Sequence, residues 1–235
     1  MALPRIDLPL FELTIPSSGK KVQYRPFTVK EEKILLIAQE SKEIDQVILA
    51  IKQIVNNCVD DVDANKLAMF DLEYIMLNLR GKSINNVIKF NVKDPDTEEQ
   101  VELILDIDKV SLTHKENHSK KITLNDEYSL IMRYPTINEL KALTAVQNKN
   151  TEELLNIMIS CIDMLVSNDG EKIYKMSDFT DVEVKDFIEG LTSAAIKGIQ
   201  TFFQTIPVLR MEIPYKNKKG EAKTFVLEGL ESFFI

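Results

Sequence analysis

Two histidines and two cysteines are the residues of this chain whose types best suit nucleophilic catalysis or metal binding. His114 and His118 have the spacing of one helical face, but they lie in a polar run that is typical of a linker. Two histidines without a third ligand nearby make a poor metal site. Cys58 and Cys161 fall on the apolar faces of predicted helices, where a reduced thiol packs as a small hydrophobic group. We therefore expect neither a metal nor a cofactor.

Paired carboxylates could in principle act as a general acid and base, and the chain has such pairs at Asp60/Asp61 and Glu98/Glu99. Both pairs are adjacent residues in predicted turns, where exposed charge is the usual explanation. The seven glycines are scattered, so they form no phosphate-binding loop, and no Gly-x-Ser-x-Gly, His-Glu-x-x-His or Cys-x-x-Cys motif occurs. The sequence predicts no catalytic residues and a protein that is not an enzyme.

A Thr-x-x-Glu spacing is the clearest local signal in the sequence. It occurs at Thr28/Glu31 and again at Thr136/Glu139. In a capping box the hydroxyl and the carboxylate satisfy backbone N–H groups that the first helical turn leaves unpaired. The surrounding segments share further residues at an offset of 108: Arg25, Thr28, Glu31, Lys33, Leu35 and Gln39 recur as Arg133, Thr136, Glu139, Lys141, Leu143 and Gln147. This repetition predicts two equivalent strand-to-helix corners.

The elements expected around the first corner follow from hydrophobic periodicity and turn residues. They are strands at 8–15 and 21–27, helices from Val29 to about Glu40, from Glu43 to Cys58 and over the segment marked by Leu67 and Leu77, and strands at Val87–Lys93 and Val101–Asp108.

A similar order is expected around the second corner. It comprises strands at Lys121–Leu124 and Tyr128–Tyr134, helices from Ile137 to about Gln147, Asn150 to Val166, Thr180 to about Leu191 and Thr192 to Thr205, and strands at Val208–Tyr215 and Lys223–Leu227. The Asn150–Val166 segment is apolar nearly all round. It is either a central core helix or half of a subunit interface.

These patterns predict an α+β fold that arose by internal duplication. Each half consists of a β-hairpin, a helical segment and a second β-hairpin. We expect the first half at 1–112, a linker at 113–118 and the second half at 119–235. With 235 residues, the chain is long enough for each half to bury a core.

Charge and hydropathy exclude two classes of partner. The net charge is −8, and lysine and arginine are not clustered, so we expect no nucleic-acid binding. No apolar run approaches the roughly 18 residues of a membrane span, so we expect no membrane association. The first residues lack the layout of a signal peptide, which predicts a cytoplasmic product.

The last six residues, 230–235, are unusually apolar. Leu230, Phe233, Phe234 and Ile235 would expose large hydrophobic side chains if they stayed in solvent. Either they fold back on the last hairpin or they dock into a partner. These four residues are the candidate partner-docking site.

Several segments resemble a known family. Tyr24–Lys33, Phe70–Tyr74, Leu79–Ser83 and Val226–Phe234 look like the baseplate hub assembly proteins of T4-like contractile-tailed bacteriophages. The resemblance implies a protein assembled in the host cytoplasm into the virion tail baseplate. Its partners would be other baseplate hub proteins and the tape-measure protein. The resemblance leaves open whether the protein also forms a homo-oligomer.

Three functional classes compete. An enzyme is the weakest of them, and only a pocket with convergent carboxylates and strongly shifted pKa values would favour it. The other two fit the resemblance. The protein is either a structural component of the hub or a transient tail-assembly chaperone that is absent from the mature virion. Some relatives carry cysteine pairs at hairpin tips that suggest zinc knuckles. The corresponding tips here, Lys93–Glu98 and Tyr215–Gly220, contain no cysteine, so the resemblance implies no metal for this chain.

Overall fold

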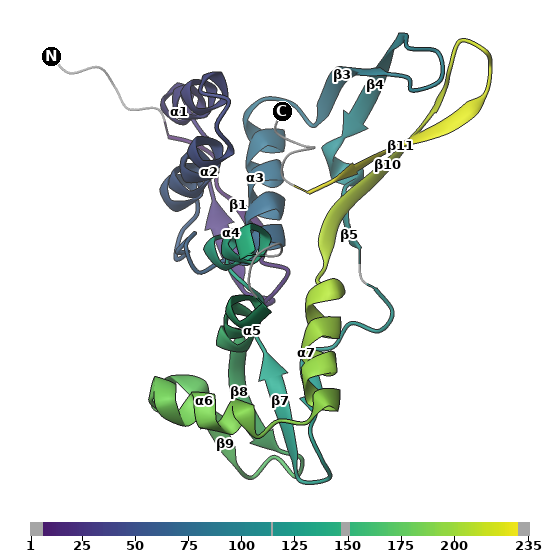
Figure 1. The fold of residues 1–235 in the computed structure, drawn as a ribbon. Coiled ribbons are helices and arrows are strands. Elements are labelled where there is room, and N and C mark those ends of the chain that lie inside the picture. Colours follow the sequence, from purple (N-terminus) through teal and green to yellow (C-terminus); the bar gives the residue numbers. More distant parts are fainter. Residues whose placement is uncertain (1–6, 114, 147–150, 230–235) are drawn as a thin grey trace, which may run out of the picture. The chain divides into compact units, whose positions relative to one another are not determined.

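The computed structural model describes residues 7–113, 115–146 and 151–229. Within these ranges the chain forms seven α-helices and four small antiparallel sheets, which confirms the predicted α+β class (Figure 1). The chain divides into two compact units, Met1–Thr113 with Val208–Ile235, and His114–Pro207.

The first unit begins with the predicted order of hairpin, three helices and hairpin. Its elements are β1 (Phe11–Thr14), β2 (Lys21–Tyr24), α1 (Val29–Glu40), α2 (Ile44–Cys58), α3 (Met69–Ser83), β3 (Val87–Lys93) and β4 (Gln100–Asp106). α2 is strongly amphipathic and buries its apolar stripe. α3 is apolar on most sides, and Ile75, Met76 and Leu79 are completely buried. This helix therefore forms the centre of the unit.

The last hairpin of the chain also belongs to this first unit. After the short 3₁₀ helix η1 (Ile107–Lys109), β5 (Ser111–Thr113) pairs with β10 (Val208–Lys216). β10 pairs along its length with β11 (Ala222–Glu228), so the sheet order is β11-β10-β5. The predicted boundaries place these C-terminal strands in the second half and Thr113 in the linker. β5 is only three residues long, so hydrophobic alternation could not reveal it.

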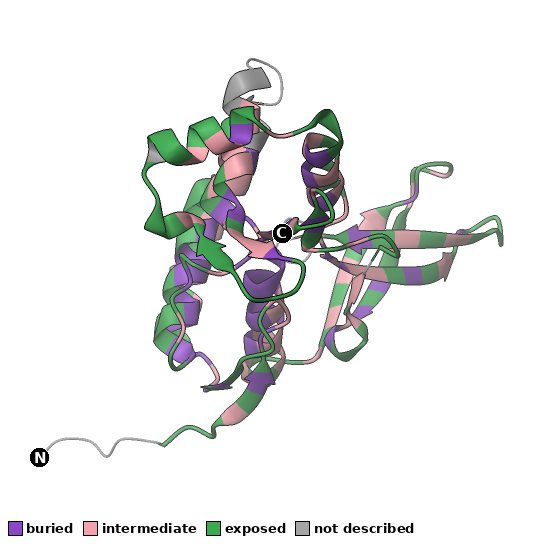
Figure 2. Ribbon diagram, turned by 90° about the horizontal axis from the view of Figure 1, so that it is seen from below, coloured by how far each residue is buried: buried purple, intermediate pink, exposed green. Residues whose placement is uncertain are grey.

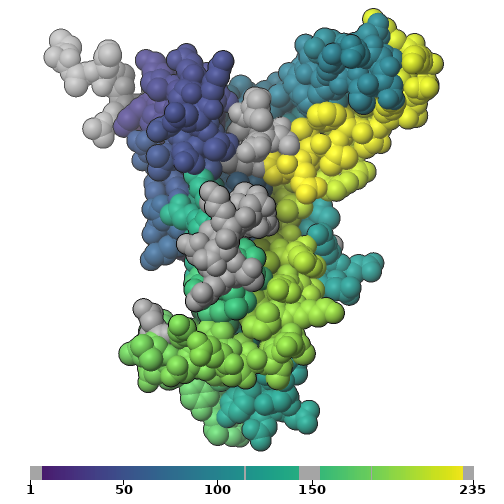
Figure 3. Space-filling model, in the orientation of Figure 1, coloured from purple at the N-terminus to yellow at the C-terminus, as the bar shows by residue number. Residues whose placement is uncertain are grey.

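The β3–β4 and β10–β11 hairpins lie side by side within the first unit (Figures 1 and 3). The rings of Phe90 and Phe225 are 6.0 Å apart, and the Tyr215 hydroxyl donates to Asp94 Oδ2 at 2.8 Å. Lys218 Nζ lies 2.7 Å from Glu99 Oε1. Apart from these contacts, the two hairpins carry mostly exposed and half-buried residues (Figure 2). We call them the hairpin pair.

The second unit is built on a four-stranded sheet of order β6-β7-β8-β9. Its elements are β6 (Lys121–Thr123), β7 (Tyr128–Met132), α4 (Ile137–Val146), α5 (Thr151–Ser160), β8 (Ile162–Ser167), β9 (Ile173–Lys175), the 3₁₀ helix η2 (Met176–Asp178), α6 (Asp181–Glu189) and α7 (Ser193–Gln204). Its core joins Leu130 and Met132 of β7, Ile162 of β8, and Ile199 and Phe202 of α7.

The expected helix from Asn150 to Val166 is wrong in its last third. α5 ends at Ser160, and Ile162–Ser167 form strand β8 between β7 and β9. A short apolar run cannot be assigned to a helix or to a fully buried strand by periodicity alone. Here the run has pairing partners on both edges, and these long-range hydrogen bonds decide its conformation. Cys161 therefore lies after the helix, although it is buried as expected.

None of the described helices combines the length and the apolar character that a membrane span requires.

Candidate protein-interaction site

The two predicted corners are built by the same set of contacts. The backbone N–H of Arg25 donates to the carbonyl of Cys58, and that of Arg133 donates to the carbonyl of Cys161, both at 2.9 Å. The Arg25 guanidinium bonds to Glu31 Oε1 at 3.1 Å and to the Asn57 carbonyl at 3.0 Å. Its counterpart Arg133 bonds to Glu139 at 2.6 Å and to the Ser160 carbonyl at 2.8 Å. Each arginine thus ties the start of one helix to the end of the next.

The predicted capping role of the Thr-x-x-Glu motifs is confirmed for Thr28 and Glu31. The Thr28 N–H donates to Glu31 Oε2 at 2.8 Å, and the Thr28 hydroxyl accepts from the Lys30 N–H at 3.3 Å. The Thr136 N–H likewise donates to Glu139 at 2.7 Å. A third box at Thr180/Glu183 starts α6.

The ionisable groups of the corners have shifted pKa values with structural causes. Burial alone would raise the pKa of Glu31, but hydrogen bonds from Thr28 and Arg25 outweigh it and lower the pKa to about 2. The pKa of Glu139 is lowered for the same reasons. Burial raises the pKa of Cys58 and of Cys161 to about 11, so both thiols are protonated at neutral pH and poor nucleophiles. The corners therefore hold the fold together.

His118 is half-buried and packs against the core of the second unit instead of lying in an open linker. Its ring nitrogens are 2.9 Å from the Thr205 hydroxyl and 2.9 Å from the Tyr134 hydroxyl. The ring also stacks on Tyr134 and on Phe202. His114 lies outside the described residues. In the described ranges, no group of three or more His, Cys, Asp or Glu side chains is arranged to hold a metal ion.

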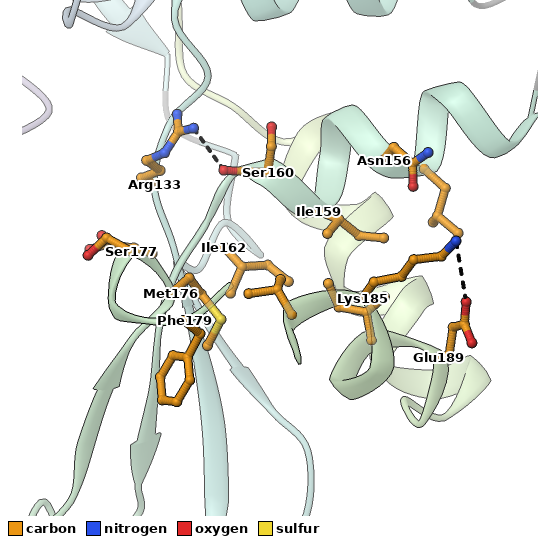
Figure 4. A pocket seen from close by; sticks show the side chains of 14 residues that line it. Arg133, Asn156, Ile159, Ser160, Ile162, Met176, Ser177, Phe179, Lys185 and Glu189 are labelled. Atoms are coloured by element: carbon orange, nitrogen blue, oxygen red, sulfur yellow. Dashed lines mark hydrogen bonds and ion pairs between the residues drawn. The ribbon is translucent and has the colours of Figure 1, made fainter. Parts of the chain in front are cut away.

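The second unit has a groove on its surface (Figure 4). A pocket of about 760 Å³ lies between α5, β8, η2 and α6. A second pocket of about 350 Å³ adjoins it, because both are lined by Met176, Phe179 and Val184. We call the two together the α6 groove. Its other apolar lining residues are Leu155, Ile159, Ile162, Leu165, Tyr174, Phe187 and Ile188.

The groove exists because the chain between α5 and α7 is long. In the first unit, residues 59–68 join α2 to α3, whereas residues 161–192 of the second unit form β8, β9, η2 and α6. α6 has nine residues, and Ile188 is its one buried residue among those whose burial is described. The helix therefore forms a wall of the groove and does not fill it. The site could not be predicted from the sequence, because its apolar residues come from turns and short elements without a clear period.

The polar groups at the groove are largely paired within the protein. Lys185 Nζ lies 3.9 Å from Glu189 Oε1, and Arg133 is bonded to Ser160 (Figure 4). Apolar surface of the groove is left available instead, since Phe179 and Tyr174 are both exposed. A concave, mainly apolar site with few convergent polar groups suits the hydrophobic side chains of another protein.

The residues that sequence analysis selected for partner docking lie elsewhere in the chain. Leu230, Phe233, Phe234 and Ile235 are outside the described residues. The described chain ends at Gly229, which follows β11 and whose N–H bonds to the carbonyl of Leu209. Docking by residues 230–235 therefore stays a prediction, and the α6 groove is a separate candidate site.

Comparison with known proteins identifies the family. A family model described as "T4 bacteriophage base plate protein" matches residues 8–235, nearly the whole chain. The comparisons with curated proteins and with solved structures find no match. The family match covers every segment on which the resemblance to phage baseplate proteins was based. The chain therefore belongs to the T4 bacteriophage base plate protein family.

Proposed function

We propose that this baseplate protein is a non-enzymatic structural component of the baseplate hub and acts through contacts with other proteins. The observation that carries the proposal is the family match over residues 8–235. A position in the hub is a more specific proposal than a role in the baseplate. It rests on the similarity of segments such as Tyr24–Lys33 and Val226–Phe234 to hub assembly proteins.

The chemistry of the described residues supports a structural role. Groups with shifted pKa values often mark active sites, but here they fix the fold. Glu31 and Glu139 cap helices and bind arginines, and Asp94 joins the two members of the hairpin pair. The α6 groove offers a hydrophobic surface of the kind that proteins bury against one another.

The partners we propose are other hub proteins and the tape-measure protein, met during assembly in the host cytoplasm. Nucleic acid and membrane are not part of this proposal. Two surfaces would make the contacts: the apolar residues Leu230, Phe233, Phe234 and Ile235, and the α6 groove.

The first experiment measures whether the protein is part of the finished particle. Phage tails are purified, and the protein is quantified by mass spectrometry against known hub proteins. A structural component is expected at a fixed stoichiometric ratio in mature tails. A protein that assembly requires but that mature tails lack would instead be a transient chaperone, and the structural proposal would be wrong.

A second experiment tests the groove. Phe179→Asp places a charge in its apolar lining, whereas Val182→Asp changes an exposed residue of α6 that does not line it. We expect the Phe179 variant to remain folded but to enter tails poorly, because a charge in a desolvated contact is costly. The Val182 variant should enter normally. Equal incorporation of both variants would remove the groove from the proposal.

A further inference from the structure

Helix α1 has apolar residues on two opposite faces. Its inner face buries Leu35 and Ala38 together with Glu31. Its outer face exposes Val29, Leu36 and Ile37, which keep 64%, 52% and 68% of their accessible surface. A helix that packs on one side only normally carries polar residues on the other. α1 packs on α2, which in turn packs on α3, so α1 lies at the edge of this helical layer (Figure 1).

The outer residues form one continuous line along the helix. Positions 29, 33, 36 and 40 are spaced by four, three and four residues and so share a face, with position 37 beside them. This α1 stripe consists of Val29, Lys33, Leu36, Ile37 and Glu40, all of them exposed. The α1–α2 region forms the purple to dark-blue surface in Figure 3.

The second corner shows that the fold does not need this stripe. At the offset of 108, Leu36 and Ile37 correspond in sequence to Thr144 and Ala145. The contacts that build the corner, made by Arg25 and Glu31 in one unit and by Arg133 and Glu139 in the other, are the same. The large apolar side chains of Leu36 and Ile37 are therefore specific to the first unit. Exposed apolar surface of this kind marks contacts with another protein.

The charges on the stripe indicate which protein would bind to it. Lys33 lies in the first half of α1 and Glu40 at its last position. The last turn of α1 has no basic residue to offset the negative end of the helix dipole, and Glu40 adds a further negative charge there. An antiparallel partner helix with a lysine opposite Glu40 would compensate both the negative end of the helix dipole and the charge of Glu40. α1 itself has that pattern.

We propose that α1 is a self-association surface on which α1 of a second copy packs in the antiparallel direction, centred between Leu36 and Ile37. In this register Lys33 of each copy lies beside Glu40 of the other. Since a two-fold axis repeats every contact, both ion pairs form at once and both helix ends gain a cation. Leu36 and Ile37 form the apolar centre. The inference concerns solution behaviour, so it does not depend on the position of the protein in the hub.

The size of the contact sets the expected affinity. A helix of 12 residues is about 18 Å long. One pair of such helices buries less than the roughly 1,200–2,000 Å² of a standard stable interface. We therefore expect a weak dimer with a dissociation constant in the range of about 1 µM to 1 mM. In an assembly that brings copies together, such a contact would be reinforced by high local concentration.

Sedimentation equilibrium of the full chain over a wide concentration range tests the proposal. The wild type is expected to show a monomer–dimer equilibrium, and the double variant Leu36→Ser/Ile37→Ser to stay monomeric. Val182→Ser is the matched control, because Val182 is as exposed as Ile37, also at 68%, and lies on another helix. Thermal melting confirms that the variants fold. A wild type that remains monomeric throughout, or a dimer that the double variant preserves, would overturn the proposal.

Charge exchange tests the antiparallel register. Lys33→Glu and Glu40→Lys should each weaken association by roughly tenfold at low salt, because each creates two like-charge contacts in the dimer. Combining them reverses both pairs and should restore association close to the wild-type level. A combined variant that is weaker than either single variant would exclude this pairing. As an independent measurement, Ile37→Cys should allow crosslinking between copies, and Val182→Cys should not.

Discussion

Glu31 is the residue on which the contacts of the first corner converge. Its carboxylate accepts from the Thr28 N–H, from the Thr28 hydroxyl and from the Arg25 guanidinium, and its side chain is buried. The capping half of this arrangement could be predicted from the Thr-x-x-Glu spacing. The arginine half could not, because the bond from Arg25 to the Asn57 carbonyl joins residues far apart in the sequence. The recurrence of Arg25 as Arg133 was the available signal.

The caps should contribute measurably to stability. We expect Thr28→Ala and Thr136→Ala each to lower the free energy of unfolding by about 0.5–2 kcal/mol, the usual loss when a capping hydroxyl is removed. Denaturant titration measures the change. Thr28→Ser keeps the oxygen and is the control, which should stay close to the wild type. If neither alanine variant shifts the unfolding midpoint, the hydroxyls do not stabilise the helices.

The lowered pKa of Glu31 predicts a pH dependence. Its folded value of about 2 lies below its ordinary value of 4.5, so the ionised carboxylate stabilises the fold above pH 4.5, and this contribution is lost as the pH falls towards 2. The contribution is on the order of 3 kcal/mol. Glu31→Gln should therefore be less stable than the wild type at pH 7, and the difference should shrink in acid.

The control for Glu31→Gln is the same substitution at a carboxylate that is not buried. Glu12→Gln removes the exposed ion pair with Lys21 and should leave the unfolding free energy nearly unchanged at neutral pH. Urea unfolding of all three proteins across pH 2–7 supplies the data. A constant difference between wild type and Glu31→Gln over this range would contradict the assignment of the pH dependence to Glu31.

At the scale of elements, most helices and hairpins could be predicted from the sequence, since capping, periodicity and turn residues are local. β8 and β5 could not. β8 is an apolar run whose conformation is decided by pairing with β7 and β9, and β5 pairs with β10, almost one hundred residues away. The α6 groove escaped prediction for a related reason. Its walls come from α5, β8, η2 and α6, and their approach depends on tertiary packing.

The hairpin pair offers a test at this scale. The Tyr215 hydroxyl donates to Asp94, whereas Asp94 also accepts from the N–H groups of its own turn, at Asp96 and Thr97. Tyr215→Phe should therefore loosen the contact between the hairpins without opening either turn. We expect faster amide hydrogen exchange at the two tips, 94–99 and 217–221. Tyr174→Phe is the control. Unchanged exchange would show that the remaining contacts suffice, namely the Phe90–Phe225 rings and the ion pairs that Lys218 makes with Glu99 and Lys223 makes with Asp96.

At the scale of the whole molecule, duplication stays a prediction that the shared corner contacts support. We expect 1–112 and 119–235 to superpose as hairpin, helical segment and hairpin, with the segment from β8 to α6 as an insertion in the second half. The turns of the two hairpins in the hairpin pair also resemble each other. One begins with the buried Asp94 and the other with the buried Asn217, and each of these side chains accepts a hydrogen bond from an N–H group of its own turn. An experimental structure in which β1, β2, α1 and α2 do not superpose on β6, β7, α4 and α5 would exclude duplication.

Residues 230–235 are the segment that we propose to dock into a hub partner. Phe233 and Phe234 would each bury about 150–250 Å² in a contact, and at roughly 25 cal/mol per Å² such burial is worth several kcal/mol before ordering costs. Gly229, with a φ of 75°, lies between β11 and this segment and permits a change of direction there. If part of the gain is realised only against a hub partner, the isolated protein does not need the segment.

We therefore predict that deletion of Leu230–Ile235 leaves a folded and soluble protein that fails to enter baseplates. Thermal melting and incorporation into tails are measured on the same preparation, and Phe233→Ser/Phe234→Ser is a milder variant that keeps the chain length. A deleted chain that unfolds or aggregates alone would assign the segment to the protein's own core. Normal incorporation of the deleted chain would show that the segment docks into no partner, and the α6 groove and the α1 stripe would then be the surfaces left to join the protein to its neighbours.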